Sequence, residues 1–168
     1  DSRAQPRSLN EESPRVLVIM GGSDPDELTT KVLRSLASIE HELEITAVIG
    51  RADQYEKLES LGSSMQHSLD VRVAERNMAA LMAQADIAIS AAGSTVWELC
   101  FMGIPMVLAA TEINQSAVIQ QAEAAGAAVR LPDLGADVIK AVLSTILNGK
   151  GRLGVMSRAG QQLVDGEG

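Results

Sequence analysis

The chain has 168 residues, enough for one domain with a sizeable core, and it carries a net charge of −8. This acidic balance and an aromatic content of 2% are unlike those of nucleic-acid-binding proteins, so we expect no nucleic-acid partner. The sequence contains no segment typical of a membrane span or a signal peptide, and a single cysteine, Cys100, suits a reducing cytosol. We therefore expect a cytoplasmic protein in which Cys100, within an apolar segment, is buried and is not a nucleophile.

The N-terminal segment differs in composition from the rest of the chain. Residues 1–14 are polar, of mixed charge, and contain Pro6 and Pro14, a composition typical of a linker. At the other end, residues 165–168 include no closing apolar element. We therefore expect residues 15–168 to form the folded domain of a longer protein, with an N-terminal domain or a partner subunit missing upstream.

Short apolar segments alternate with segments of helical spacing along the whole chain. In order they predict strand 15–20, helix 24–39, strand 45–49, helix 54–61, strand 69–73, helix 78–82, strand 86–89, helix 94–102, strand 106–108, helix 113–125, strand 128–131, helix 137–147 and helix 156–164. Strands and helices in this alternation form right-handed βαβ units. The sequence thus predicts an α/β fold with a Rossmann-like, doubly wound sheet of six parallel strands.

Two glycine-containing turns are expected to meet at one edge of this sheet. In a six-stranded sheet of order 3-2-1-4-5-6, the first and fourth strands are neighbours, and ligands bind in the crevice at their carboxyl ends. That order places the turn at residues 21–24 beside the turn at residues 91–95. We therefore predict a ligand site between these two turns.

The first turn is acidic. Asp24, Asp26 and Glu27 lie at the expected start of the first helix, where they would repel a phosphate placed directly on it. Asp24 followed by Pro25 fits an N-cap and the first helical position, so Asp24 is expected to cap this helix and not to contact a ligand. Gly22 and Ser23 remain as a neutral backbone wall.

The second turn has no acid before Glu98. A helix start carries unpaired backbone N–H groups and the positive end of the helix dipole, which together suit a phosphate. We therefore predict that a diphosphate lies mainly on Ser94 and Thr95. The same residues also fit a capping box, in which Thr95 caps the helix and Glu98 bonds back to it, and the two interpretations are compatible.

Three other kinds of site are disfavoured. Residues 21–25 do not match G-x-G-x-x-G, and the second strand ends in Ile49-Gly50-Arg51 instead of an acid, which argues against a dinucleotide. His41 and His67 lie far in sequence from both turns, and no Cys/His cluster has metal-ligand spacing, so no metal or other cofactor is expected. The residues around Ser94 do not match the G-x-S-x-G motif of a nucleophilic serine, and the sequence offers no convincing general base.

Several segments occur together in a characteristic order. They are residues 21–25, Asn77-Met78, 85–89, 92–98, 103–105 and Asn114-Gln115. This set resembles the C-terminal, donor-binding domain of GT-B-type enzymes over about residues 16–166. The resemblance is nearest to UDP-sugar hydrolases of pseudaminic-acid synthesis and to spore-coat polysaccharide biosynthesis proteins, and more distant to peptidoglycan N-acetylglucosaminyltransferases.

The resemblance implies that the domain binds a UDP-sugar as one half of a GT-B architecture. Gly22 and Ser23 match the glycine-rich loop that faces the donor diphosphate. Gly93, Ser94 and Thr95 match the phosphate-binding helix start. The whole enzyme would cleave or transfer the glycosyl group of the UDP-sugar in surface polysaccharide or nonulosonic acid biosynthesis.

The resemblance also implies roles for four other residues. Met78 matches the segment that encloses the uracil, although it also fits a helix core position. Glu98 matches the acid that binds the ribose hydroxyls. Asn114 and Gln115 match the loop that contacts the sugar or its phosphate, although Asn114 also fits a helix cap and Gln115 a solvent-exposed position.

Catalysis is expected to need more than this chain. Asn114 is the candidate catalytic residue here, while the main base of the similar hydrolases is a histidine of the N-terminal domain. The domain alone is therefore expected to bind the donor without turning it over. Two alternatives stay open: a glycosyltransferase donor subunit, or a non-catalytic Rossmann-like interaction module.

Overall fold

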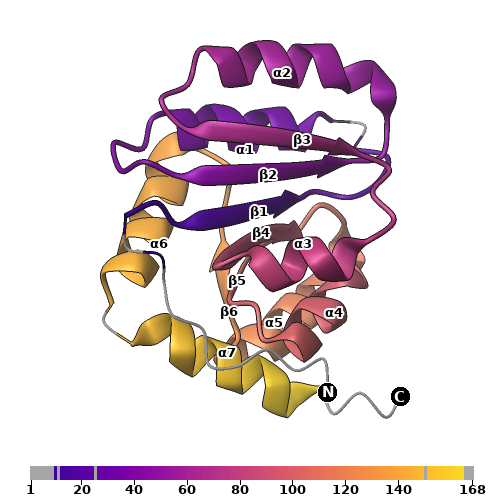
Figure 1. Cartoon of the computed structure of the whole chain (residues 1–168). Coiled ribbons are helices and arrows are strands. Elements are labelled where there is room, and N and C mark those ends of the chain that lie inside the picture. Colours follow the sequence, from indigo (N-terminus) through magenta and orange to yellow (C-terminus); the bar gives the residue numbers. More distant parts are fainter. Residues whose placement is uncertain (1–9, 11, 25, 150, 165–168) are drawn as a thin grey trace.

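The computed structural model describes residues 10, 12–24, 26–149 and 151–164, and within them strands and helices alternate as the sequence predicts (Figure 1). The strands are β1 (Arg15–Ile19), β2 (Glu44–Ile49), β3 (Ser68–Val73), β4 (Ile87–Ala91), β5 (Met106–Ala109) and β6 (Ala128–Leu131). The α-helices are α1 (Leu28–Ala37), α2 (Tyr55–Ser63), α3 (Met78–Gln84), α4 (Thr95–Met102), α5 (Ser116–Ala124), α6 (Ala136–Asn148) and α7 (Arg152–Leu163). Two short 3₁₀ turns, η1 (Ala52–Gln54) and η2 (Ile113–Gln115), precede α2 and α5.

The strands form one parallel sheet in the order β3-β2-β1-β4-β5-β6, which confirms the predicted doubly wound topology. Strand β1 pairs on both sides, with Val18 opposite Ala47 of β2 and Ile89 of β4. A central strand of a parallel sheet is covered on both faces, which explains why β1 is apolar from Val16 to Ile19.

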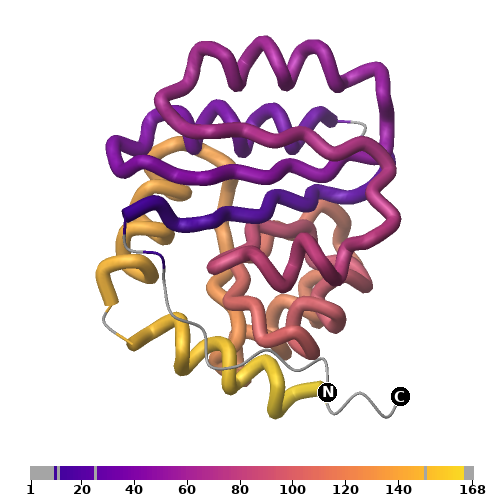
Figure 2. Tube along the Cα trace, viewed as in Figure 1, coloured from indigo at the N-terminus to yellow at the C-terminus, as the bar shows by residue number. Residues whose placement is uncertain are grey.

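The core has two layers, one on each face of the sheet. Alternate residues of β1 enter different layers: Val16 and Val18 pack toward α1 and α6, while Leu17 and Ile19 pack toward α3, α4 and α5. Figure 2 shows the last helix, α7, returning across the molecule to lie beside α4. Both faces of the sheet are therefore covered, and the loops lie at the ends of the strands.

An ion pair joins the two central strands at their amino ends. The carboxylate of Asp86, 1% exposed, accepts hydrogen bonds from the Arg15 backbone N–H at 2.8 Å and from the Arg15 guanidinium at 3.1 and 3.0 Å. The Asp86 N–H in turn donates to the Arg15 carbonyl at 2.8 Å. The hydrogen bond from the Arg15 side chain to the Asp86 carboxylate also raises the pKa of Arg15. Together the side-chain and backbone bonds fix the register of β1 against β4 at the amino ends of the two strands.

The predicted linker lies largely outside the described residues, which include only 10 and 12–14 of it. There, the Asn10 side chain accepts hydrogen bonds from the N–H groups of Glu12 and Ser13. Pro14 is buried, and its carbonyl accepts a bond from Glu44 N–H at 3.0 Å. Sheet pairing thus begins at Pro14, beside the expected boundary.

Candidate functional site

A cleft of about 360 Å³ opens at the carboxyl ends of β1 and β4. Three loops line it, one after each of β1, β4 and β5. They contribute Gly21, Gly22, Ser23, Asp24 and Asp26 from the first, Gly93, Ser94 and Thr95 from the second, and Thr111, Glu112 and Gln115 from the third. The two turns that the sequence placed side by side are therefore adjacent, at the point where the strand order reverses.

The first loop differs from its prediction in one respect. The expected helix start at Asp24 is wrong, because α1 begins at Leu28, and Asp24 and Glu27 have left-handed backbones (φ 37° and 51°). Glu27, not Asp24, is therefore the N-cap residue, but the Asp24 carboxylate still accepts hydrogen bonds at the helix start, from the N–H groups of Leu28 at 2.7 Å and Thr29 at 3.0 Å. Pro25, assigned to the first helical position, lies outside the described residues.

The first loop rests against Gly50, which directly follows β2. A Cβ on Gly50 would lie 2.8 Å from the carbonyl carbon of Gly22 and closer still to its oxygen. A side chain at residue 50 would therefore displace the backbone of this cleft wall. A glycine directly after a strand is the signal that could have indicated such a close approach.

The second loop presents the start of α4 to the cleft. The Gly93 N–H donates to the Ala91 carbonyl at 2.9 Å, and the N–H groups of Val96 and Trp97 donate to the carbonyls of Gly93 and Ser94. For the N–H groups of Ser94 and Thr95, no protein acceptor occurs within the described part of the chain. These two donors are thus available where the helix dipole is positive.

The capping-box interpretation of this helix start is wrong. Ser94, not Thr95, is the N-cap residue, and it makes no side-chain cap hydrogen bond. Thr95 is already the first helical residue, and Glu98, one turn further on, is exposed. With no side chain bonded across the helix end, its N–H groups remain accessible to a ligand.

The third loop is held by Gln115. Its side-chain oxygen accepts from the Thr111 N–H at 2.7 Å, from the Thr111 hydroxyl at 2.9 Å and from the Glu112 N–H at 3.3 Å. With its oxygen occupied in this way, Gln115 offers a ligand only its side-chain NH₂ group. The neighbouring Asn114 is exposed, does not line the cleft and is not the N-cap of η2 or α5.

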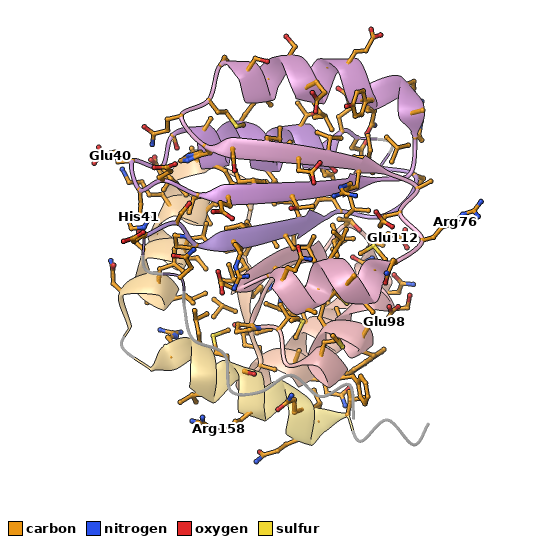
Figure 3. The ribbon with its side chains drawn as sticks, viewed as in Figure 1. Glu40, His41, Arg76, Glu98, Glu112 and Arg158 are labelled. Carbon is orange, nitrogen blue, oxygen red and sulfur yellow. The ribbon has the colours of Figure 1, made fainter. Side chains whose placement is uncertain are left out.

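The structure brings most, but not all, of the predicted site residues together. Those that line the cleft are Gly22, Ser23, Gly93, Ser94, Thr95 and Gln115. Met78, Glu98 and Asn114 lie outside its lining. Met78 is half-buried and packs against the core layer that lies between the sheet and helices α3, α4 and α5. Figure 3 shows Glu98 on the same side of the molecule as Glu112, toward the carboxyl ends of the strands.

Charge in the cleft comes from carboxylates. Asp24, Asp26 and Glu112 line it, and no lysine or arginine is among the described residues that do so. Asp24 is 4% exposed and is occupied with the amides of α1. An anion in this cleft would therefore be held by backbone N–H groups and the dipole of α4 instead of by cationic side chains.

The histidines lie away from the cleft. His67 is buried, where its Nδ1 accepts from the Leu43 N–H at 3.1 Å and its Nε2 lies 2.8 Å from the Leu36 carbonyl, so it is the neutral tautomer that donates from Nε2. His41 lies at the opposite side of the molecule in Figure 3. Within the described residues, no group of His, Cys, Asp and Glu side chains is arranged to hold a metal ion.

Comparison with known proteins connects this cleft to a family. Residues 16–165 match the family model of the glycosyltransferase family 28 C-terminal domain. The chain belongs to this family. It is 28% identical over 171 residues to the spore coat polysaccharide biosynthesis protein SpsG of Bacillus subtilis, covering 96% of this chain and 49% of SpsG. It is also 39% identical over 105 residues to the uncharacterized protein MJ1062 of Methanocaldococcus jannaschii, covering 61% of this chain and 22% of MJ1062.

Solved structures of glycosyltransferases share the fold of this family 28 domain. The MurG structure from Acinetobacter baumannii superposes with a TM-score of 0.79 at 22% identity, covering 95% of this chain and 50% of MurG. The spinosyn rhamnosyltransferase SpnG in complex with thymidine diphosphate superposes with a TM-score of 0.73 at 15% identity, covering 94% of this chain and 43% of SpnG. The chain thus spans about half the length of SpsG and MurG. Among the described helices, none has the length and apolar character needed to cross a membrane.

Proposed function

We propose that this domain binds the nucleoside diphosphate part of a UDP-sugar and is the donor-binding half of an enzyme that cleaves or transfers the glycosyl group. The observation that carries the proposal is a pair of residues, Ser94 and Thr95, that line a three-loop cleft and whose N–H groups have no acceptor among the described residues. Family membership and the likeness to SpsG, named for spore coat polysaccharide biosynthesis, support a role in surface polysaccharide synthesis, to which we add nonulosonic acid synthesis as part of the proposal alone.

The chemistry of this half is to hold the leaving group. In glycosyl cleavage or transfer, the bond between the anomeric carbon and a diphosphate oxygen breaks, and its electron pair stays on the diphosphate. Fixed N–H donors and the positive end of α4 stabilise the charge that develops there. The acceptor oxygen, from water or from a sugar hydroxyl, bonds to the anomeric carbon and gives its proton to a base.

We assign no base to this chain. Asn114, the predicted catalytic residue, is exposed and lies outside the cleft lining. The acceptor and the base are therefore expected on the N-terminal half of the enzyme, in line with the share of SpsG and MurG that this chain does not cover. Water as acceptor would make the enzyme a hydrolase, and a sugar hydroxyl would make it a glycosyltransferase.

Calorimetric titration of the 168-residue chain with UDP, uridine and NADPH tests the proposal. We expect UDP to bind more tightly than uridine, because only UDP carries the diphosphate that the start of α4 would bind. Absence of UDP binding at millimolar nucleotide would sink the proposal and favour a non-catalytic interaction module. A preference for NADPH over UDP would favour a dinucleotide site instead.

A further inference from the structure

A buried hydroxyl, that of Ser90, lies at the cleft. Ser90 is the fourth residue of β4, whose other residues are isoleucine and alanine, and it is 1% exposed. It lies opposite Ile19 of β1 and Leu108 of β5 in the sheet, and it lines the cleft. A buried hydroxyl is costly unless it is hydrogen-bonded, so its partner indicates what it does.

Ser90 bonds to the carbonyl that shapes the second loop. Its Oγ donates to the Ala91 oxygen at 2.9 Å. The same oxygen accepts the Gly93 N–H at 2.9 Å, which closes a three-residue turn around Ala92. A carbonyl oxygen has two lone pairs, so Ser90 and Gly93 together occupy its accepting capacity.

This turn connects the sheet to the start of α4. Ala92 still pairs with β5, because its N–H donates to the Ala109 carbonyl at 3.1 Å. Directly after it, the backbone turns, and the next two N–H groups, of Ser94 and Thr95, are the ones that face the cleft without a protein acceptor. The turn that the Ala91 carbonyl closes thus directly precedes these two donors.

We propose that Ser90 is a positioning residue for the diphosphate: by holding the Ala91 carbonyl, its hydroxyl keeps the turn in the geometry that aims the Ser94 and Thr95 N–H groups into the cleft. This inference rests on the proposed function, because it concerns the same anion site. Because its hydroxyl bonds within the second loop, to which the diphosphate is assigned, we expect a change at Ser90 to affect the phosphate end of the ligand and not the nucleoside.

Three substitutions separate the hydrogen bond from the volume of the side chain. Ser90→Ala removes the hydroxyl, Ser90→Cys keeps a similar volume with a much weaker donor, and Ser90→Thr keeps the hydroxyl. We expect Ser90→Ala and Ser90→Cys to weaken UDP binding by roughly fivefold, as for the loss of one neutral hydrogen bond, with uridine affinity unchanged. Ser90→Thr should retain the wild-type ratio of UDP to uridine affinity.

Both affinities are measured by NMR titration of the whole chain, with thermal unfolding recorded for each variant to confirm that it folds. If UDP and uridine affinity fall together, or if Ser90→Cys keeps the wild-type ratio, the positioning role is wrong. If the wild-type chain binds no UDP, the proposed function itself fails, which is a different result. If Ser90→Thr does not fold because of its extra methyl group, the UDP-to-uridine affinity ratios of Ser90→Ala and Ser90→Cys still test the positioning role.

Discussion

Glu98 lies one turn into α4 with an exposed carboxylate, close to the start of the helix but outside the cleft lining. If it binds the ribose hydroxyls, Glu98→Gln should weaken UDP binding by about tenfold, because a bond to a charged acceptor is lost. The measurement is a calorimetric titration of both proteins with UDP and with 2′-deoxy-UDP. The wild type should prefer UDP and the variant should not; an unchanged preference would show that Glu98 does not contact the ribose.

Gly50 supports the cleft wall from behind, since a Cβ there would overlap the carbonyl of Gly22. Gly50→Ala should therefore displace the first loop and lower UDP affinity several-fold, even though residue 50 does not line the cleft. The matched control is Gly154→Ala in α7, where φ is not positive and an added Cβ comes no closer than 3.5 Å to another side chain. Equal UDP affinity in Gly50→Ala and wild type would contradict the supporting role.

Cys100 is buried under α7, and burial raises the pKa of its thiol to about 11. In the unfolded chain the thiol ionises at a lower pH, so the free energy of unfolding should fall as pH rises from about 9 toward 11. Chemical denaturation at several pH values measures this dependence, with Cys100→Ala as control. The variant should show a flatter dependence over this range, and identical slopes would refute the assignment. The folded protein should also resist thiol alkylation at about pH 8.5.

At the scale of elements, the Arg15–Asp86 pair is expected to carry much of the stability of the β1–β4 contact. Asp86→Asn should lower the free energy of unfolding by about 2 kcal/mol, because it removes the charge from a buried, charge-assisted set of bonds. Urea unfolding measures this. Asp70→Asn, which breaks an exposed pair with Arg72, is the matched control and should have little effect. UDP affinity should be unaffected in both variants, because both pairs lie away from the cleft lining.

The strands and most helices could be predicted from the sequence because burial imposes a pattern on it. Strand β1 is apolar from Val16 to Ile19 because both its faces are covered, and this pattern locates the strand. The start of α1 could not be predicted in this way. It depends on left-handed backbones at Asp24 and Glu27, which are uncommon outside glycine, and on a cap that reaches from four residues upstream.

The candidate site was predictable where it depends on topology and unpredictable where it depends on side-chain direction. The strand order alone brings the loops after β1 and β4 together. The orientation of Gln115 toward its own loop, the contact of Gly50 with Gly22 and the exposure of Asn114 depend on three-dimensional packing. Ser90 gave no motif signal, because a lone serine in an apolar strand is common to many kinds of protein.

At the scale of the whole molecule, the protein and the ligand proposed for its cleft both carry a net negative charge. The chain has a net charge of −8, and no described lysine or arginine lines the cleft. Long-range attraction is therefore absent, and UDP affinity should not fall between about 0.02 M and about 0.3 M NaCl, although the screening length changes about fourfold. Titrations at both salt concentrations check this. A steep loss of affinity with salt would indicate a cationic contact that the described cleft does not contain.

If the domain is the donor-binding half of an enzyme, as proposed, the lack of lysine and arginine among the described residues of the cleft lining affects how the two halves attract each other. Backbone dipoles hold an anion without neutralising it, so a loaded cleft would keep the whole negative charge of its nucleotide, in addition to Asp26 and Glu112. A positively charged surface on the other half of the enzyme would then be drawn to the loaded domain more strongly than to the empty one. Donor binding would in this way draw the two halves together, and departure of the nucleotide would let them separate. Neither step would need a conformational change within this domain.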